Sequence, residues 1–107
     1  MITIQDFKKV EMKAGKVVSV DEHPNADKLL ILRADLGEER PRTLVAGLKD
    51  YYSAEELEGK NIVVVTNLEP VQLRGVRSEG MLLAAQEGDK VVLLTLDQDI
   101  APGSPVL

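Results

Sequence analysis

The feature that most restricts the fold is a series of short, β-branched apolar segments, each bounded by residues that favour turns. Residues 62–66 form an unbroken apolar run, which is typical of a buried central strand. In residues 30–36 apolar side chains alternate with Arg33 and Asp35, and this pattern predicts a strand that is buried on one face. Gly, Pro, Asn and Asp interrupt these segments along the chain, which indicates an all-β protein.

The same signals predict further strands at residues 14–20, 43–46, 81–85 and 91–96. Gly15 within the first of them suggests a bend or a close approach of two backbones. A basic turn is expected around Gly75, over residues 73–78, and a hairpin turn over residues 87–89.

Helices are expected to be few and short. Ser53 is a favourable N-cap, Glu56 stands at the capping-box position, and Gly59 marks the end of a helix over residues 54–58. A brief helical turn is expected after Thr3, which also has an acidic residue three positions later.

About six strands and one central helix match a Greek-key barrel of the OB type better than a β-sandwich. We therefore predict an all-β OB-fold barrel of about five strands, with one short helix and terminal extensions. An SH3-like barrel or a small sandwich would give a similar strand count, and periodicity does not separate them. The apolar pattern runs from end to end without a linker, so residues 1–107 are expected to form one domain.

Composition excludes several classes of protein. The chain has no cysteine, which excludes disulfides and thiolate metal sites and fits a reducing compartment. No apolar run reaches the roughly 18 residues that a membrane-spanning helix needs. The first residues lack a basic segment followed by an apolar one, so no export signal is expected. These observations predict a cytoplasmic protein.

Catalytic and metal-binding patterns are also missing from the sequence. His23 is the only histidine, and zinc needs several nitrogen or sulfur ligands, so a loop or stacking role is expected for it. No serine stands in a nucleophile-elbow sequence, and no glycine-rich phosphate loop precedes a helix. We therefore expect no catalytic residues, no metal and no cofactor.

The charge balance argues against a polyanionic ligand unless the charges are unevenly distributed. Lys and Arg number 13 against 18 acidic residues, for a net charge of −5, and phosphate contacts supply most nucleic-acid affinity. Aromatic residues make up 3%, too few for a groove that stacks single-stranded bases. Basic residues nevertheless cluster, at Lys8, Lys9, Lys13, Lys16, Lys28, Arg74 and Arg77. A barrel could bring them to one face, although an ordinary solvated surface would give the same pattern.

Three stretches, in order, resemble a known family. They are residues 6–17 (DFKKVEMKAGKV), 23–29 (HPNADKL) and 63–82 (VVVTNLEPVQLRGVRSEGML). Together they resemble the tRNA-binding domain at the C-terminus of many methionyl-tRNA synthetases, whose free-standing relatives include structure-specific tRNA-binding proteins and a bacterial export chaperone. The resemblance implies an OB fold, recognition of tRNA by shape, and a homodimer built from the two chain ends. Lys13 stands where the family often has Arg, and Ala46 where Ser is common.

The resemblance and the side-chain chemistry together give a set of residues expected to bind tRNA: Lys13, Asn25, Lys28, Asn67, Arg74, Ser78, Glu79 and Met81. The three cations would anchor phosphates, and the two asparagines would reach base edges or ribose hydroxyls. Ser78, Glu79 and Met81 match the S-x-G-M motif of the family. There the hydroxyl would bind an exposed nucleotide, the carboxylate would accept from a base, and the thioether would face an unstacked base.

Each assignment has a structural alternative. Asn25 and Asn67 are also common turn residues, which would leave their side chains without a ligand. From its spacing alone Met81 is better suited to core packing, and Glu79 can be a surface charge that repels RNA.

We therefore predict a non-catalytic module that binds tRNA and assists methionyl-tRNA synthetase, as its C-terminal domain or as a separate subunit. Its expected partners are tRNA, a second copy of the chain and the synthetase. Two alternatives stay open: an export or folding chaperone that binds unfolded peptides, and a purely structural dimerisation domain.

Overall fold

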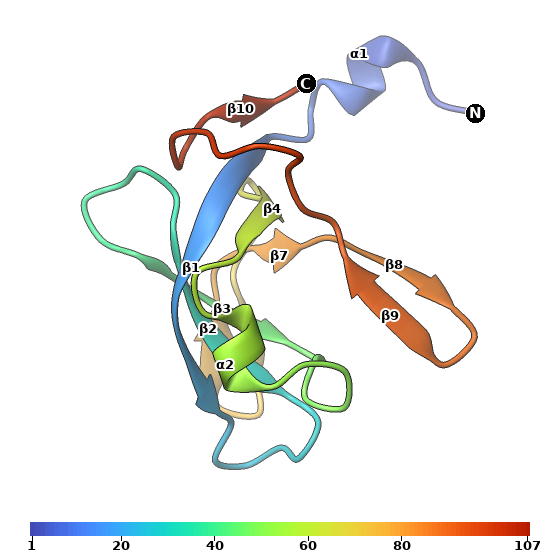
Figure 1. Cartoon of the computed structure of the whole chain (residues 1–107). Coiled ribbons are helices and arrows are strands. Elements are labelled where there is room, and N and C mark those ends of the chain that lie inside the picture. Colours follow the sequence, from blue (N-terminus) through green and yellow to red (C-terminus); the bar gives the residue numbers. More distant parts are fainter.

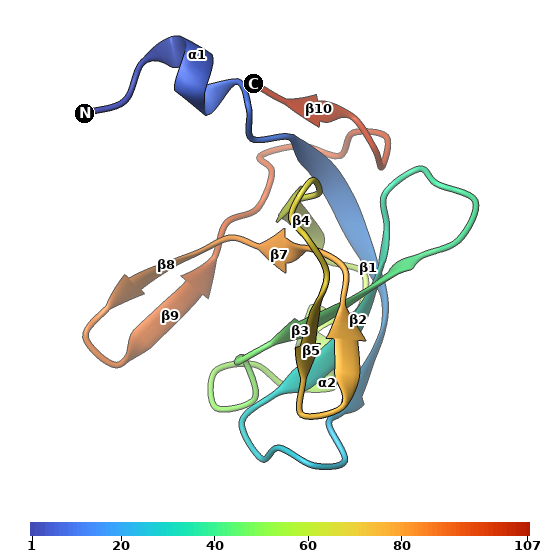
Figure 2. The same cartoon turned by 180° about the vertical axis from the view of Figure 1, so that it is seen from behind.

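The computed structural model describes residues 1–107 and shows a nearly closed antiparallel β-barrel (Figure 1, Figure 2). The main sheet has the order β3–β2–β1–β4–β7. Its strands are β1 (Met12–Glu22), β2 (Leu30–Asp35), β3 (Arg42–Ala46), β4 (Asn61–Val65) and β7 (Met81–Leu82). Beside it lie two hairpins, β5 (Val71–Leu73) with β6 (Val76–Ser78) and β8 (Ala84–Glu87) with β9 (Lys90–Leu93), and β10 (Pro105–Val106) pairs with β1. The prediction of an all-β OB fold is confirmed.

The longest strand, β1, connects the two walls of the barrel. Its first part pairs with β4 and most of the rest pairs with β2. The register with β2 shifts between Val17 and Ser19, and such a bulge bends a strand. Gly15 lies where the two walls meet, and a Cβ there would be 3.3 Å from the backbone oxygen of Asp35 and 2.7 Å from Cδ2 of Leu36. The predicted close approach at Gly15 is therefore confirmed.

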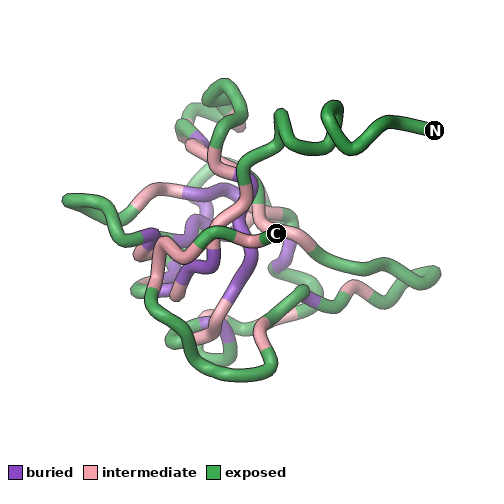
Figure 3. The backbone as a smooth tube through the Cα atoms, turned by 90° about the horizontal axis from the view of Figure 1, so that it is seen from above, coloured by how far each residue is buried: buried purple, intermediate pink, exposed green.

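Aliphatic side chains from the strands and from one helix fill the core. The largest fully buried ones are Leu32, Leu36, Leu44, Leu57, Ile62, Val17 and Val64. Figure 3 shows the buried residues gathered at the centre of the molecule. The helix, α2 (Ala54–Leu57), begins with the predicted capping box between Ser53 and Glu56. It places Leu57 in the core with an exposed fraction of 0%.

Hydrogen bonds from residues 78–80 hold the barrel closed. The Ser78 hydroxyl accepts a hydrogen bond from the backbone N–H of Val45 at 3.0 Å. The Glu79 carboxylate accepts from the N–H of Thr43 at 3.1 Å, and the Glu79 N–H donates to the Thr43 carbonyl at 2.8 Å. A Cβ at Gly80 would lie 3.0 Å from a backbone oxygen of β4. The S-x-G motif thus joins β3 to the strands that close the barrel.

Two predicted segments differ from the structure, which has ten strands instead of about six. Residues 73–78, expected as a turn, belong to the β5–β6 hairpin. Residues 81–85, expected as one strand, are divided between β7, which pairs with β4, and β8, which pairs with β9. The chain leaves the main sheet at Leu83, whose N–H still donates to the Val63 carbonyl at 3.1 Å.

The two terminal segments lie together at one end of the barrel (Figure 1). The first helix, α1 (Ile4–Phe7), also begins with a capping box, between Thr3 and Asp6, and it buries no residue. β10 pairs with the start of β1, where Met12 is opposite Val106. No helix in the structure has both the length and the apolar character needed to cross a membrane.

Candidate nucleic-acid interface

Two loops that are distant in the sequence meet at the end of the barrel opposite the terminal segments. Residues 23–29 connect β1 to β2, and the β5–β6 hairpin lies in the connection from β4 to β7. Nε2 of His23, at the start of the first loop, lies 2.9 Å from the carbonyl oxygen of Leu73 in the hairpin. Figure 2 shows the hairpin tip beside the 23–29 loop. In OB folds the corresponding loops flank the face that binds oligonucleotides, which makes this edge the candidate interface.

The tip of the hairpin holds Arg74 in an unusual backbone conformation. Arg74 has a φ of 54° and Gly75 a φ of 89°, and the flanking residues Leu73 and Val76 are paired. They therefore form a two-residue hairpin turn in which both central residues have positive φ, a turn that favours Asn and Gly. A residue with a Cβ in this region costs roughly 1 kcal/mol. The exposed Arg74 takes part in none of the four ion pairs of the structure, so its guanidinium is available to a phosphate.

The 23–29 loop carries a second exposed cation and an exposed amide. Lys28 lies 3.6 Å from the Asp50 carboxylate, and both side chains are mostly exposed. A surface ion pair of this kind contributes little to stability, so Lys28 can exchange Asp50 for a phosphate. The Asn25 backbone N–H donates to Nδ1 of His23, while its exposed side chain forms no hydrogen bond within the chain. Asn25 therefore has both a turn role and a free amide.

An apolar hollow of about 310 Å³ follows the hairpin toward β7. Leu68, Val71, Leu73 and Met81 line it, together with Ser78. Met81 is 50% exposed, so the structure does not place it in the core. Its thioether can face a ligand, whereas the Ser78 hydroxyl is engaged with Val45 N–H and the Gly80 carbonyl.

Asn67 and Lys13 lie toward the terminal end of the barrel. The Asn67 amide accepts from the Glu11 N–H at 2.9 Å and donates to the Lys9 carbonyl at 2.6 Å, so it ties the N-terminal segment to the end of β4. Lys13, near the start of β1, is opposite Val64 and Pro105. Glu22 is nine positions after Lys13 in β1, which is about 30 Å of strand at the usual rise. The structure therefore does not bring Lys13 to the two loops.

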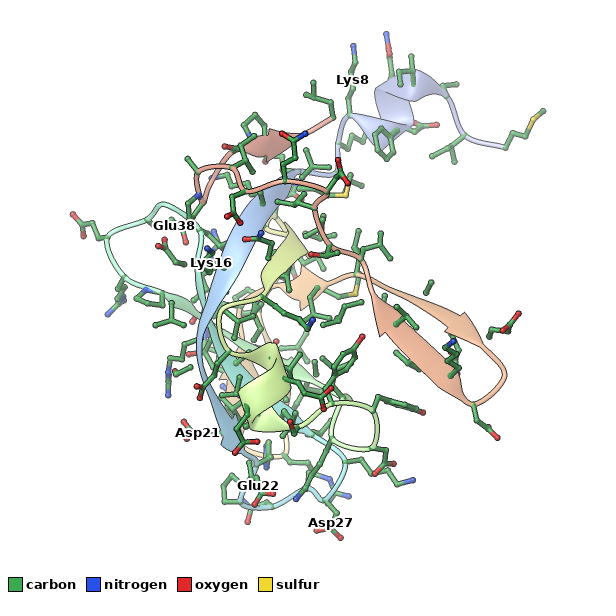
Figure 4. All side chains as sticks on the ribbon, in the orientation of Figure 1. Lys8, Lys16, Asp21, Glu22, Asp27 and Glu38 are labelled. Atoms are coloured by element: carbon green, nitrogen blue, oxygen red, sulfur yellow. The ribbon has the colours of Figure 1, made fainter.

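Charges of both signs surround the two loops. Asp21, Glu22 and Asp27 lie at this end of the barrel, and Lys8 at the other (Figure 4). Lys49 donates to the Glu22 carboxylate at 2.8 Å, and this hydrogen bond lowers the pKa of Glu22 and raises that of Lys49. Of the cations on and beside the two loops, Lys28 and Lys49 have acidic partners and Arg74 and Arg77 have none, which favours a ligand held by a small number of phosphate contacts.

A second ionic cluster lies near the start of β1 and is structural. Arg42 forms a two-pronged hydrogen bond with Glu38, at 2.8 and 2.9 Å, and also donates to the backbone carbonyls of Thr66 and Glu79. The hydrogen bond from Arg42 lowers the pKa of Glu38. Sequence reasoning did not single out Arg42, because two of its acceptors are backbone atoms of distant segments. No group of three or more His, Asp or Glu side chains in the structure could hold a metal ion.

Comparison with known proteins identifies the family. The model of the family described as "Putative tRNA binding domain" matches residues 12–105. The chain belongs to the tRNA-binding domain family. It is 52% identical over 105 residues to the methionine–tRNA ligase of Pyrococcus horikoshii, an alignment that covers 98% of this chain and 14% of that protein. The ligase of Thermotoga maritima is also 52% identical over 105 residues, which are 98% of this chain and 16% of the ligase. The tRNA-binding domain thus spans about one seventh of these relatives.

Solved structures with the same fold include a protein named as related to a synthetase and a protein named as a chaperone. A MetRS related protein from Pyrococcus horikoshii aligns with a TM-score of 0.92 and 36% identity, covering 100% of this chain and 98% of that one. The chaperone CsaA from Bacillus anthracis aligns with a TM-score of 0.89 and 29% identity, covering 100% and 99%. The tRNA-binding domain fold is therefore shared by relatives named for a synthetase and for a chaperone.

Proposed function

We propose that this tRNA-binding domain binds folded tRNA through the edge formed by the 23–29 loop and the β5–β6 hairpin, without catalysing a reaction. The observation that carries the proposal is the meeting of two loops that each carry an exposed cation, Lys28 on the first and Arg74 on the hairpin, which also borders an apolar hollow. The cations anchor phosphates, the Asn25 amide reaches a base edge or a 2′-hydroxyl, and Met81 contacts an unstacked base.

The other predicted residues have supporting parts in this proposal. Ser78 and Glu79 hold the segment that precedes Met81 against β3 through their hydrogen bonds. Asn67 holds the N-terminal segment in place, and Lys13 supplies a cation to a tRNA long enough to reach the other end of the barrel.

The test is a titration with folded tRNA, and with unstructured RNA of equal length, at several salt concentrations. Lys28→Glu and Arg74→Glu are each expected to weaken binding about tenfold or more and to reduce the log–log salt slope by roughly 0.7–0.9 for each lost phosphate contact. The matched control is Lys90→Glu, because Lys90 is also exposed but lies on the distant β8–β9 hairpin. Equal affinities for all three variants and the wild type would overturn the site.

Arg74→Asn separates binding from folding. Asn accepts positive φ more readily than Arg, so this variant is expected to stabilise the hairpin turn by a few tenths to about 1 kcal/mol. Loss of the guanidinium should nevertheless weaken tRNA binding. A variant that melts higher and binds tRNA as tightly as the wild type would contradict the role of Arg74.

We also propose that two copies of the chain associate through their terminal segments. An apolar hollow of about 400 Å³ lies between α1, the start of β1 and β10, with Ile4, Phe7, Val10, Met12 and Val106 among its lining residues. Sedimentation of the protein over a range of concentrations tests this proposal. A monomer at every concentration would contradict it.

A role beside methionyl-tRNA synthetase in the cytoplasm is supported by the relatives that are methionine–tRNA ligases. The expected result is that the domain, joined to or mixed with the synthetase, lowers the tRNA concentration needed for aminoacylation. A chaperone role is the second candidate. The fold is similar to that of the chaperone CsaA, and this chain has exposed apolar hollows. It predicts that the protein suppresses aggregation of an unfolded client and that tRNA does not compete.

A further inference from the structure

The imidazole of His23 is a buried polar side chain between the two loops of the candidate interface. Its exposed fraction is 7%. Nε2 lies 2.9 Å from the Leu73 carbonyl oxygen in the β5–β6 hairpin, and Nδ1 lies 3.0 Å from the Asn25 backbone nitrogen in the 23–29 loop. The ring therefore connects the Asn25 turn of its own loop to the β5–β6 hairpin.

These two partners determine the protonation state of the ring. A carbonyl oxygen can only accept, so Nε2 carries the hydrogen, and a backbone N–H can only donate, so Nδ1 must be unprotonated. The structure therefore contains the neutral imidazole with its hydrogen on Nε2. An imidazolium has hydrogens on both nitrogens, so its Nδ1–H would face the Asn25 N–H and the bond between them would be lost.

The charged groups on the surrounding elements do not replace that bond. They are Asp21 and Glu22 on β1, Asp27 and Lys28 in the loop, Lys49 and Asp50 after β3, and Arg74 and Arg77 on the hairpin. Lys28 pairs with Asp50 and Lys49 with Glu22, and no carboxylate lies within ion-pair distance of the imidazole. Protonation thus removes one hydrogen bond and creates no salt bridge.

We propose that neutral His23 is a positioning residue, a clip that joins the Asn25 turn of the 23–29 loop to the β5–β6 hairpin, and that its protonation releases this turn, while the bond to Leu73 stays, and weakens RNA binding. The consequence for RNA rests on the proposed function. The clip sets the spacing between Lys28 and Arg74, the two cations that would bind phosphates. Because these residues lie on separate loops, a fixed spacing reduces the conformational entropy lost on binding.

The sign of the pH dependence separates this role from direct contact. A histidine that touches phosphate gains a positive charge on acidification, so it would bind RNA more tightly at low pH. A clip histidine loses its bond to Asn25 on acidification, so RNA binding weakens instead. The buried position of the ring, with both nitrogens engaged, supports the second case.

Two substitutions each preserve one half of the clip. Asn at position 23 can accept from the N–H two residues later, as in an Asx turn, but is too short to reach Leu73. Gln can extend an amide N–H toward the Leu73 carbonyl but leaves the Asn25 N–H without its acceptor. His23→Asn and His23→Gln are therefore both expected to weaken tRNA binding at pH 8, by roughly three- to tenfold for one lost hydrogen bond.

The pH profile is the decisive readout, measured at constant ionic strength and below the melting temperature of every variant. Wild-type affinity for tRNA is expected to fall by a similar factor when the pH is lowered from about 8 to 5, while both variants keep a flat profile. Tighter wild-type binding at low pH, or wild-type affinity in either variant at pH 8, would overturn the proposal.

Amide hydrogen exchange in the free protein tests the clip without RNA. The Asn25 N–H is expected to be protected in the wild type at pH 8 and in His23→Asn, and unprotected in His23→Gln and in the acidified wild type. This pattern without tRNA binding would leave the clip standing and remove the proposed function. Binding of tRNA without this pattern would keep the function and remove the clip.

Discussion

The two helices of this tRNA-binding domain have the same length and the same start, yet they have opposite surroundings. Both α1 and α2 span four residues and begin with a complete capping box. Leu57 of α2 is fully buried, whereas Ile4 and Phe7 of α1 are 63% and 39% exposed. The same local signals therefore form both helices. How much each helix contributes to the core depends on whether its apolar side chains are buried or exposed. α2 completes the core, and α1 presents an apolar surface.

The largest difference is expected when the apolar residue of each helix is truncated. Leu57→Ala should lower the free energy of unfolding by about 3 kcal/mol, because it leaves a cavity in the core. Phe7→Ala should change it little at concentrations where the protein is monomeric. Urea denaturation measures both values. Equal losses would show that α1 belongs to the barrel as firmly as α2 does.

A charge on α1 is expected to act on self-association instead of folding. Phe7→Asp should raise the dimer dissociation constant thirtyfold or more, roughly 2 kcal/mol, because it places a carboxylate in the apolar terminal hollow. Val18→Asp is the matched control, since Val18 is exposed and apolar but lies outside that hollow. Sedimentation equilibrium distinguishes them, and equal dissociation constants would refute the terminal interface.

Removing the N-cap side chain of each helix should change the free energy of unfolding by a smaller amount. Ser53→Ala should lower the free energy of unfolding by about 1 kcal/mol, because the Glu56 N–H loses its acceptor in a helix that holds the core. Thr3→Ala removes the equivalent bond to the Asp6 N–H but should leave thermal unfolding of the monomer nearly unchanged. A similar drop in melting temperature for both would contradict the distinction between the helices.

The smallest effect is expected on acidification. The hydrogen bond from the Ser53 backbone lowers the pKa of Glu56 below its ordinary value of 4.5. A depressed pKa contributes stability above that ordinary value, and the contribution is lost as pH falls through the folded-state pKa. Glu56→Gln keeps an acceptor that does not titrate, so its urea midpoint should fall less between about pH 5 and pH 3 than the wild-type midpoint. Glu55→Gln, in the same turn, serves as control and should follow the wild type.

Features encoded locally were predictable from the sequence. The two helices could be identified from their capping residues, one strand from the alternation in residues 30–36, and one hairpin from the turn at residues 87–89. Each of these signals lies within a few residues of the element that it predicts. The β5–β6 hairpin was missed because its turn has Arg74 where Asn or Gly is usual. The division between β7 and β8 was missed because the apolar run continues while the pairing partner changes.

The site was less predictable, because several of its side chains bind backbone atoms far away in the sequence. Asn67 contacts the chain 56 and 58 residues earlier, and His23 contacts a residue 50 positions later. Composition and spacing contain no record of such partners. Lys28 and Arg74 could be selected by charge, but that their loops meet depends on the closure of the barrel.

The pairing of β10 with β1 places the last strand of the chain beside the first. The N–H of Ala14 donates to the Ser104 carbonyl, and its own carbonyl accepts from Gly103, both at 2.8 Å, so the last residues continue the sheet beside the first strand. Because β10 lies beside the start of β1, a linker can join these two strands, and new ends can be opened at the exposed turn around Gly88. Such a permuted chain would keep every barrel strand, and its termini would leave from the tip of the β8–β9 hairpin.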